Sequence, residues 1–299
     1  MKSKIHDTSF SELAKQYKKS KLHLMSKKLI ILLTSVLLIS CEETVTPDLQ
    51  TAAPRLVIDA AIDWEKGTEG NIQTIKLTTT TGYYQTEVPK VSGATVVVTN
   101  SANTVFNFVE VNTGTPTGQY VCTNFVPIIG ETYKLTVTYN GQTYTAVEKL
   151  TQTPEISNDV EQINTLGLDS DEIGVRIKCN DIANQEDFYL INVQSSVNPF
   201  PEFDYQPDLY SQGNLLYFIY SNEKLKKDSQ IHFKLSGVSE RYYTFMKILI
   251  GNANGAANGP FQVPPTKVRG NIKNQSNEQN YPIGYFSLSE SSKLSYIVK

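Results

Sequence analysis

The sequence predicts a mostly β protein: an N-terminal immunoglobulin-like β-sandwich, followed by a second mainly β domain with one short helix. Three observations support this prediction. Short runs of alternating apolar and polar residues recur from residue 55 onward, between turns rich in Gly, Pro and Asn. Hydrophobic residues make up 39% of the 299 residues, which suits a packed core rather than a disordered chain. Charged residues make up only 19%, which argues against a coiled coil.

The immunoglobulin-like sandwich is expected over residues 55–153. About seven short strands fit into this span, a density that is typical of such a sandwich. Its clearest unit is a hairpin in which residues 133–139 and 142–146 alternate on either side of Asn140-Gly141. Asn-Gly favours a type I′ turn, because both central residues of that turn need positive φ. Since these strands are enough to close a two-sheet core, residues 55–153 are expected to fold alone.

The second domain is expected over residues 154–299. Alternating or apolar runs predict strands at 173–179, 188–193, 215–220 and 230–235. The periodicity then changes: Ser239 can cap a helix, apolar residues follow at helical spacing, and Gly251 can end it. One helix is therefore predicted near residues 240–250.

The N-terminus predicts a lipid anchor. An apolar run of eleven residues, 29–39, follows a short basic segment and ends just before Ser-Cys. This run is too short to span a bilayer, which takes about 20 residues. The tetrapeptide Leu-Ile-Ser-Cys that ends at Cys41 resembles the bacterial lipobox, whose cysteine is acylated and becomes the new N-terminus. Residues 1–40 are then a signal peptide with Met25 as the expected start; an uncleaved anchor or a buried strand is the alternative.

Residues 41–54 are expected to form a flexible tether, since they are acidic, contain two prolines and show no apolar period. Glu42 and Glu43 resemble the signal that exports Bacteroidota lipoproteins to the outer cell surface; solvation of a linker is the alternative explanation. Taking away the eight Lys and two acidic residues of residues 1–40 leaves 19 basic and 28 acidic residues. A chain of that sign repels nucleic-acid phosphates, so nucleic acid is not an expected partner.

Several motifs stand in an order that resembles a known family. They comprise residues 55–58, 91–96 and 130–135, Tyr242-Tyr243, residues 258–264, Gly270-Asn271-Ile272 and Gly284-Tyr285-Phe286-Ser287. Over residues 41–299 this order resembles a Bacteroidota lipoprotein family catalogued as domain of unknown function 4249. The chain departs from the family pattern at residues 273–281, where Asn and Gln replace the expected Gly-rich turn.

The resemblance implies an outer-membrane lipoprotein, of a kind often encoded beside a TonB-dependent receptor. The expected partners are therefore that receptor and the membrane that holds the lipid anchor. The expected location is the outer membrane, facing either the periplasm or the cell exterior. The resemblance carries over no catalytic residues, because none are established for the family.

Few residues after the predicted cleavage site could carry chemistry. His232 is the one histidine after Cys41, and it lies on a predicted strand without a second ligand at a recognised spacing, so no metal or cofactor is expected. Cys122 and Cys179 could form a disulfide or remain buried free thiols, and their predicted separate domains favour free thiols. Residues 169–172 resemble part of a calcium loop but lack its Gly and distal Glu, which favours a solvated turn.

Aromatic residues predict a contact surface between the strands that end near residue 195 and start near residue 215. Three prolines there predict an irregular surface excursion, whose aromatic residues are Phe200, Phe203, Tyr205 and Tyr210. Aromatic side chains are enriched at binding hot spots, so we expect at least two of these rings to face a receptor or ligand. The alternative is that they cap the second sandwich. Whether Tyr83 and Tyr84 form a surface pair or pack in the core stays open.

The expected function is non-enzymatic. The chain is interpreted as an outer-membrane lipoprotein that is an accessory or ligand-capturing partner of a TonB-dependent receptor. The alternative is a stand-alone surface adhesin or carbohydrate-binding module that uses its sandwich loops for binding. An enzyme ranks third.

Overall fold

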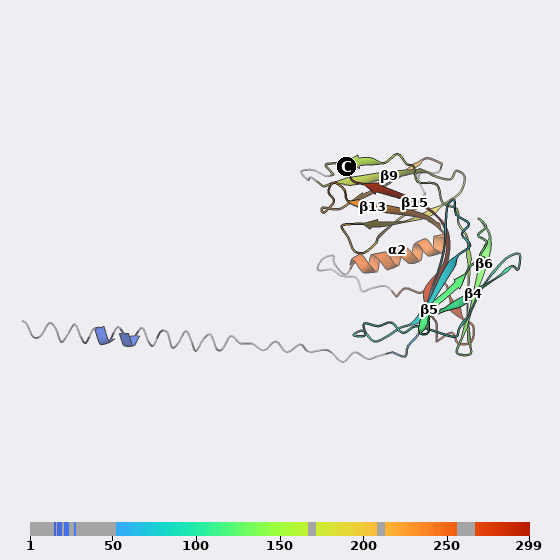
Figure 1. Cartoon of the computed structure of the whole chain (residues 1–299), viewed down its shortest axis with the longest axis horizontal. Coiled ribbons are helices and arrows are strands. Elements are labelled where there is room, and N and C mark those ends of the chain that lie inside the picture. The colour runs from blue at the N-terminus through green and yellow to red at the C-terminus, as the bar shows by residue number, and fades with distance from the viewer. Residues whose placement is uncertain are drawn as a thin grey trace, which may run out of the picture. The chain divides into compact units, whose positions relative to one another are not determined.

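The computed structural model describes residues 15, 17–19, 21–23, 27, 52–166, 172–207, 213–255 and 267–299 (Figure 1). The chain divides into two compact units, residues 1–50 and 51–299. In the first unit the described residues are helical. No helix within the described ranges is both long and apolar enough to cross a membrane. Cys41 and most of the predicted signal peptide and tether lie outside the described residues.

The first sandwich is built from strands that alternate buried and exposed side chains, as the sequence predicts. One sheet contains β1 (Leu56–Glu65), β2 (Gln73–Thr79) and β5 (Pro116–Cys122), and the other contains β3 (Thr95–Asn100), β6 (Thr132–Tyr139) and β7 (Gln142–Lys149). Strand β4 (Val105–Asn112) joins them, because its first half pairs with β3 and its second half with β5. The side chains between the two sheets form one hydrophobic core.

The predicted hairpin turn is confirmed. Asn140 and Gly141 have φ angles of 49° and 71°, and Tyr139 pairs with Gln142 across the turn. Two consecutive positive φ angles are the requirement of a type I′ turn, which only Gly, Asn and Asp meet readily.

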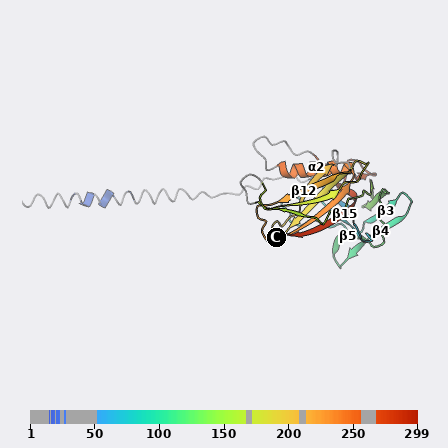
Figure 2. The ribbon, with the colours of Figure 1, turned by 90° about the horizontal axis from the view of Figure 1, so that it is seen from above.

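The second sandwich packs two sheets around a separate core. One sheet contains β8 (Glu161–Ile163), β9 (Gly174–Asn180) and β12 (Leu215–Ser221), and the other contains β10 (Phe188–Ser195), β11 (Glu202–Pro207) and β13 (Gln230–Val238). Helix α2 (Glu240–Gly255) covers the outer face of the second of these sheets, where Tyr243 and Met246 pack on Leu190 and Val238. Figures 1 and 2 both place α2 with this sandwich and β4 and β5 at the other end of the unit. The predicted fold class is confirmed: a mostly β chain with an N-terminal β-sandwich and a second mainly β domain, in which the described residues form one helix.

The last strand belongs to both sandwiches. Strand β15 (Ile283–Ile297) pairs in parallel with β1 through residues 283–291, then antiparallel with β13 through residues 291–297. The short strand β14 (Lys273–Asn274) adds to β7. Ile272, Phe286 and Leu288 therefore complete the first hydrophobic core. The first sandwich thus contains residues from beyond its predicted end at position 153, and folding of residues 55–153 alone stays a prediction.

The connection between the sandwiches is hydrogen-bonded to this shared strand. The Thr153 hydroxyl donates to the Glu290 carbonyl oxygen at 2.6 Å and accepts from the backbone N–H of Gly237. The Thr153 N–H donates to the Glu290 carboxylate at 2.9 Å, and Lys66 forms an ion pair with the same carboxylate at 2.9 Å. These groups are buried, so they fix the linker to β15 through bonds that water cannot replace.

Two local predictions differ from the structure. The helix is longer than residues 240–250, because Gly251 lies inside it rather than at its end; Ser239 caps its start, accepting from the N–H of Tyr242 at 3.2 Å. Residues 202–207 form strand β11, not the irregular excursion that the three prolines predicted. Pro199 and Pro201 precede that strand and Pro207 ends it, and an edge strand tolerates proline there.

Candidate functional site

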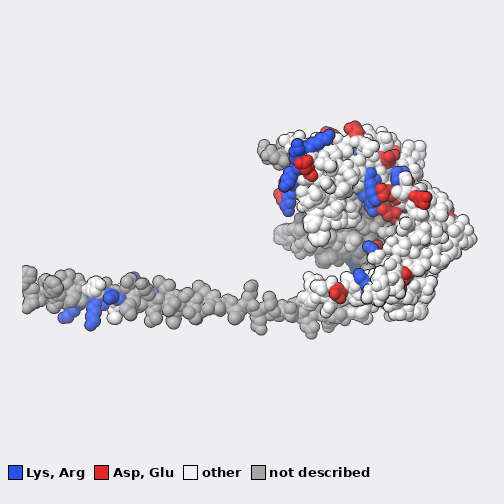
Figure 3. Space-filling view, viewed as in Figure 1, with Lys and Arg blue, Asp and Glu red and all other residues white. Residues whose placement is uncertain are grey.

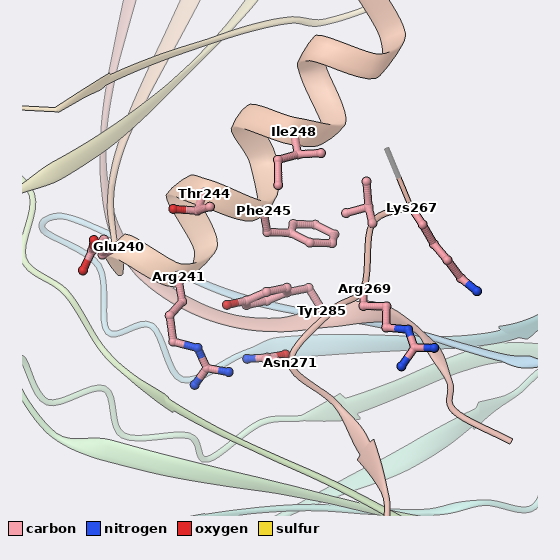
Figure 4. A pocket seen from close by; sticks show the side chains of 11 residues that line it. Glu240, Arg241, Thr244, Phe245, Ile248, Lys267, Arg269, Asn271 and Tyr285 are labelled. Carbon is pink, nitrogen blue, oxygen red and sulfur yellow. The ribbon is translucent and has the colours of Figure 1, made fainter. Parts of the chain in front are cut away.

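Two adjacent cavities share one wall, the segment of residues 267–272. The first has a volume of about 390 Å³ and lies between the start of α2, this segment and Tyr285 of β15 (Figure 4). The second, of about 320 Å³, lies on the side of β14 and Tyr281. Arg269 and Gly270 line both cavities. We take this pair of cavities as the candidate functional site.

Two glycines bring the shared wall against β15. A Cβ atom on Gly270 would lie 1.7 Å from the carbonyl oxygen of Gly284, and one on Gly284 would lie 2.0 Å from the carbonyl oxygen of Ile58. Gly284 also has a φ of 108°, a region that side-chain-bearing residues rarely adopt. Both positions therefore require glycine for the segment to lie this close to the sheet.

Asn271 fixes the register of the shared wall, residues 267–272, against β15. Its side-chain amide donates to the carbonyl oxygen of Phe286 at 2.7 Å and accepts from the N–H of Phe286 at 2.9 Å. The buried Glu148 carboxylate accepts from Asn271 and from the Tyr285 hydroxyl, each at 3.3 Å. Burial, followed by the nearby Glu148 charge, raises the pKa of Tyr285. The hydroxyl therefore stays protonated and donates to the carboxylate.

Aromatic rings form one wall of the first cavity. The ring centroids of Phe245 and Tyr285 are 4.7 Å apart, and their ring planes are inclined at 45°. The ring centroid of Tyr242 also lies 4.7 Å from that of Tyr285. In Figure 4 the rings of Phe245 and Tyr285 lie together, with Ile248 one turn further along α2. This wall offers a rigid apolar surface to a bound molecule.

Cations gather around the same cavities. Figure 4 shows Arg241 and Arg269 on either side of Asn271, and Lys267 beyond Arg269. Three cations approach the ring of Tyr281: Arg55 at 3.9 Å, Arg269 at 4.2 Å and Lys267 at 5.5 Å from its centroid. A hydrogen bond from Lys267, and then the Arg55 charge, lowers the pKa of the Tyr281 hydroxyl. The ring thus holds guanidinium groups at the second cavity by cation–π contact.

The structure places the predicted contact residues in different surroundings. Phe200 is 73% exposed and Phe203 is 44% exposed. Tyr205 instead packs on Tyr243 of α2, with ring centroids 5.6 Å apart. Tyr210 lies outside the described residues. Two of the four rings therefore face solvent and one helps to hold the helix.

Within the described residues, β11 and β12 are each an edge strand of their sheet, and the two edges lie side by side. The Tyr220 hydroxyl of β12 donates to the Glu202 carboxylate of β11 at 2.8 Å. Phe203 is exposed on the α2 side, where it lines a third cavity with Tyr242 and Met246. Leu215, Tyr217 and Ile219 of β12 are exposed on the other side of the sandwich, because their neighbours along the strand point into the second core. Open sheet edges and exposed apolar side chains are typical of interaction surfaces.

The remaining candidates from the sequence have structural explanations. His232 is exposed, and its Nδ1 lies 2.7 Å from the Ser295 hydroxyl. Among the described residues, no carboxylate forms an ion pair with His232, so none orients the imidazole as a general base would require. Cys122 and Cys179 are free thiols buried in different cores. Tyr83 and Tyr84 form an exposed edge-to-face pair. No group of three potential metal ligands occurs among the residues that the structure describes, and residues 169–171 are not among these.

The basic cavities are the part of the site that sequence reasoning missed. Lys267, Arg269 and Lys273 stand close together in the sequence, but Arg55 and Arg241 are far from them, so the sequence did not show that these residues meet. A signal was nevertheless present in the motif Gly270-Asn271-Ile272 and in Gly284-Tyr285-Phe286-Ser287, which form the shared wall and the strand beneath it.

The model of the family described as Domain of unknown function (DUF4249) matches residues 42–295. The chain belongs to this family. As a DUF4249 protein, it carries the two glycine motifs of the cavity wall inside the matched region. No curated protein matches it.

Several solved structures share a general likeness with this DUF4249 protein. A cytokine receptor complex is 9% identical, with a TM-score of 0.25, over 61% of this chain and 82% of that chain. The chicken CNTN1 FN1–FN3 domains are 16% identical, with a TM-score of 0.26, over 60% and 62%. A segment of two fibronectin type-III domains from chicken tenascin is 7% identical, with a TM-score of 0.20, over 62% and 90%.

Proposed function

We propose that this DUF4249 protein is a non-enzymatic, lipid-anchored outer-membrane protein that captures a ligand for a TonB-dependent receptor. The observation that carries the proposal is the pair of cavities, whose common wall is built from residues of the family motifs. A cavity with an aromatic wall and cations around it is equipped to bind and orient a molecule. Binding without turnover is the activity that an accessory protein of a transporter needs.

Anchoring is supported by the sequence around Cys41. The family match begins at residue 42, directly after the cysteine that ends the lipobox-like tetrapeptide. A lipid on Cys41 would leave residues 42–54 as a tether before β1. Three acyl chains hold a protein on a membrane stably, because each buried CH₂ contributes about 0.8 kcal/mol.

Receptor contact is supported by the open edge of the second sandwich. Phe200 and Phe203 are exposed there, just before β11 and on that edge strand. Aromatic side chains bury large rigid areas when a partner covers them, so this edge is the proposed receptor contact.

A metabolic fatty-acid label tests the anchor. We expect the wild-type protein to take up the label, and Cys41→Ala to lose the label and accumulate as unprocessed precursor. Cys122→Ala is the matched control, because it removes a cysteine in the first core and is expected to keep the label. Labelling of Cys41→Ala at the wild-type level would contradict the anchor.

A second candidate function is a stand-alone adhesin or carbohydrate-binding module. The exposed pair Tyr83 and Tyr84 favours it, since sugar rings stack on exposed aromatic faces. A receptor gene next to this one favours the first function, and a neighbourhood of polysaccharide-degrading genes favours the second.

A further inference from the structure

The arginines of the chain are concentrated at the two cavities. The sequence contains four arginines, at positions 55, 176, 241 and 269. Arg241 lines the first cavity, Arg269 lines both, and Arg55 lies over the ring of Tyr281, which lines the second. Three of the four therefore lie at one site, although they come from three separate segments.

These three arginines form no ion pair within the described residues, whereas the fourth arginine does. Arg176 forms an ion pair with Glu161 at 2.9 Å. Lys234 forms an ion pair with Asp63 at 3.2 Å. Figure 3 shows basic and acidic side chains interspersed on the visible face of the molecule. Over the described ranges, no carboxylate lies within 4 Å of the guanidinium groups of Arg55, Arg241 or Arg269.

Acidic partners are not scarce in this chain. Residues 41–299 contain 28 acidic against 19 basic residues. Guanidinium groups are planar, always charged and suited to oxyanions, which they bind through two parallel hydrogen bonds. Glu240 lines the first cavity and Glu278 lines the second. Within the described ranges neither carboxylate forms an ion pair with these guanidinium groups, so the groups are equipped for an anion from outside the protein.

The lining of the first cavity also favours a ligand that has an apolar part. Phe245, Ile248 and Tyr285 form the apolar part of its lining, and Figure 4 shows Arg241 and Arg269 on either side of Asn271, near these rings. A free inorganic anion would leave the aromatic wall uncovered. An anion that carries a ring or short apolar chain would cover it and gain from the removal of apolar surface from water.

We propose that the two cavities bind an organic anion, a phosphate or carboxylate attached to an apolar ring or chain. Arg241 and Arg269 hold the anionic group, and Phe245 and Tyr285 hold the apolar body. Arg55, fixed on Tyr281, adds positive charge from the second cavity. This proposal names the class of ligand that the proposed function leaves open, and its biological use rests on that function. The binding itself needs neither the lipid anchor nor the receptor.

Isothermal titration calorimetry of the full chain in detergent, at low ionic strength, tests this proposal with three probes. Phenyl phosphate carries both features, phenol lacks the charge and inorganic phosphate lacks the ring. We expect phenyl phosphate to bind at least about tenfold more tightly than either of the others. Equal or weaker binding of phenyl phosphate would overturn the proposal.

The variants Arg241→Gln and Arg269→Gln locate the site. Each is expected to weaken phenyl phosphate binding at least about tenfold at an unchanged melting temperature, because both side chains are exposed. Arg176→Gln is the matched control, since it removes the one remaining arginine, and its affinity is expected to stay within about twofold. Wild-type affinity in both Arg241→Gln and Arg269→Gln would overturn the assignment.

Sedimentation with vesicles distinguishes a free ligand from a lipid headgroup. If the natural anion is a headgroup, the wild-type chain sediments with phosphatidylglycerol vesicles more than with phosphatidylcholine vesicles, and Arg269→Gln abolishes the difference. If the wild-type chain sediments equally with both kinds of vesicle, the ligand is a free organic anion. Failure of receptor contact in cells leaves these measurements unaffected, so the two proposals fail separately.

Discussion

Gly270 and Gly284 lie backbone to backbone, so that a methyl group on Gly270 would be 1.7 Å from the carbonyl oxygen of Gly284. The chain between them includes strand β14, yet their contact sets the depth at which residues 267–272 lie on β15. Asn271 adds two hydrogen bonds to Phe286 at 2.7 and 2.9 Å and so fixes the register. Backbone packing thereby places Arg269 at the boundary of both cavities, where its guanidinium group lies 4.2 Å from the centroid of the Tyr281 ring.

Gly270→Ala is expected to destabilise the fold by about 3 kcal/mol, because the added methyl meets backbone atoms that have no room to shift. Gly251→Ala is the control, since a Cβ there meets nothing within 4 Å and α2 should gain about 1 kcal/mol. Urea denaturation of the full chain measures both. Equal stability of Gly270→Ala and wild type would mean that the wall does not require this contact.

Thr153→Val keeps the shape of the side chain but removes the hydroxyl that bonds Glu290 and Gly237. Two buried backbone groups then lose a partner, and we expect a loss of about 2 kcal/mol. Thr132→Val on the exposed face of β6 should stay within about 0.5 kcal/mol. A thermal melt compares them; a Thr153→Val protein as stable as Thr132→Val would contradict the role of this hydroxyl.

The two buried thiols should resist labelling in the folded protein. Burial raises the pKa of Cys179 to about 12, and burial also raises the pKa of Cys122. Because the thiolate is the reactive form, little of either thiol can react with iodoacetamide at pH 8. In a Cys41→Ala chain we expect both thiols to be labelled only after denaturant is added. Rapid labelling of the folded chain would show that at least one core opens readily.

Stability should fall in alkaline solution. Burial is the foremost cause that raises the pKa of several tyrosines in the folded state, namely Tyr120, Tyr133, Tyr144, Tyr189, Tyr220, Tyr242, Tyr243 and Tyr285. Between the unfolded pKa of about 10 and the folded value, the unfolded chain has lost protons that the folded chain keeps. The free energy of unfolding therefore decreases as the pH rises through about 10. Denaturant midpoints at pH 7, 9 and 10.5 measure this, and a constant midpoint would contradict it.

Local sequence patterns were sufficient to predict the fold class and the Asn140-Gly141 turn, because strand alternation and positive φ angles are local properties. The shared strand could not be predicted in this way. Its residues alternate like any strand, and only the completed fold shows that Phe286 belongs to one sandwich and Leu294 packs against the core of the other. The prolines near Phe203 misled the prediction, because their effect depends on whether a strand lies at an edge.

The site was partly visible in the sequence. Phe200 and Phe203 are exposed and Tyr205 packs on α2, while contact of at least two rings with a receptor or ligand stays a prediction. The basic cavities were not visible, since Arg55, Arg241 and Arg269 are far apart in the chain and meet only after β1, α2 and the cavity wall have assembled. Long-range pairing of this kind leaves no local periodicity to detect.

Receptor contact at the open edge is tested most directly by photo-crosslinking in cells that produce both proteins. A benzophenone amino acid replaces Phe200 or Phe203, and replaces Tyr83, which is 84% exposed, as the control. We expect the first two positions to form one adduct with an outer-membrane TonB-dependent receptor, identified by mass spectrometry, and the control to form none. No receptor adduct from Phe200 and Phe203, or the same adduct from Tyr83, would contradict the proposed receptor contact.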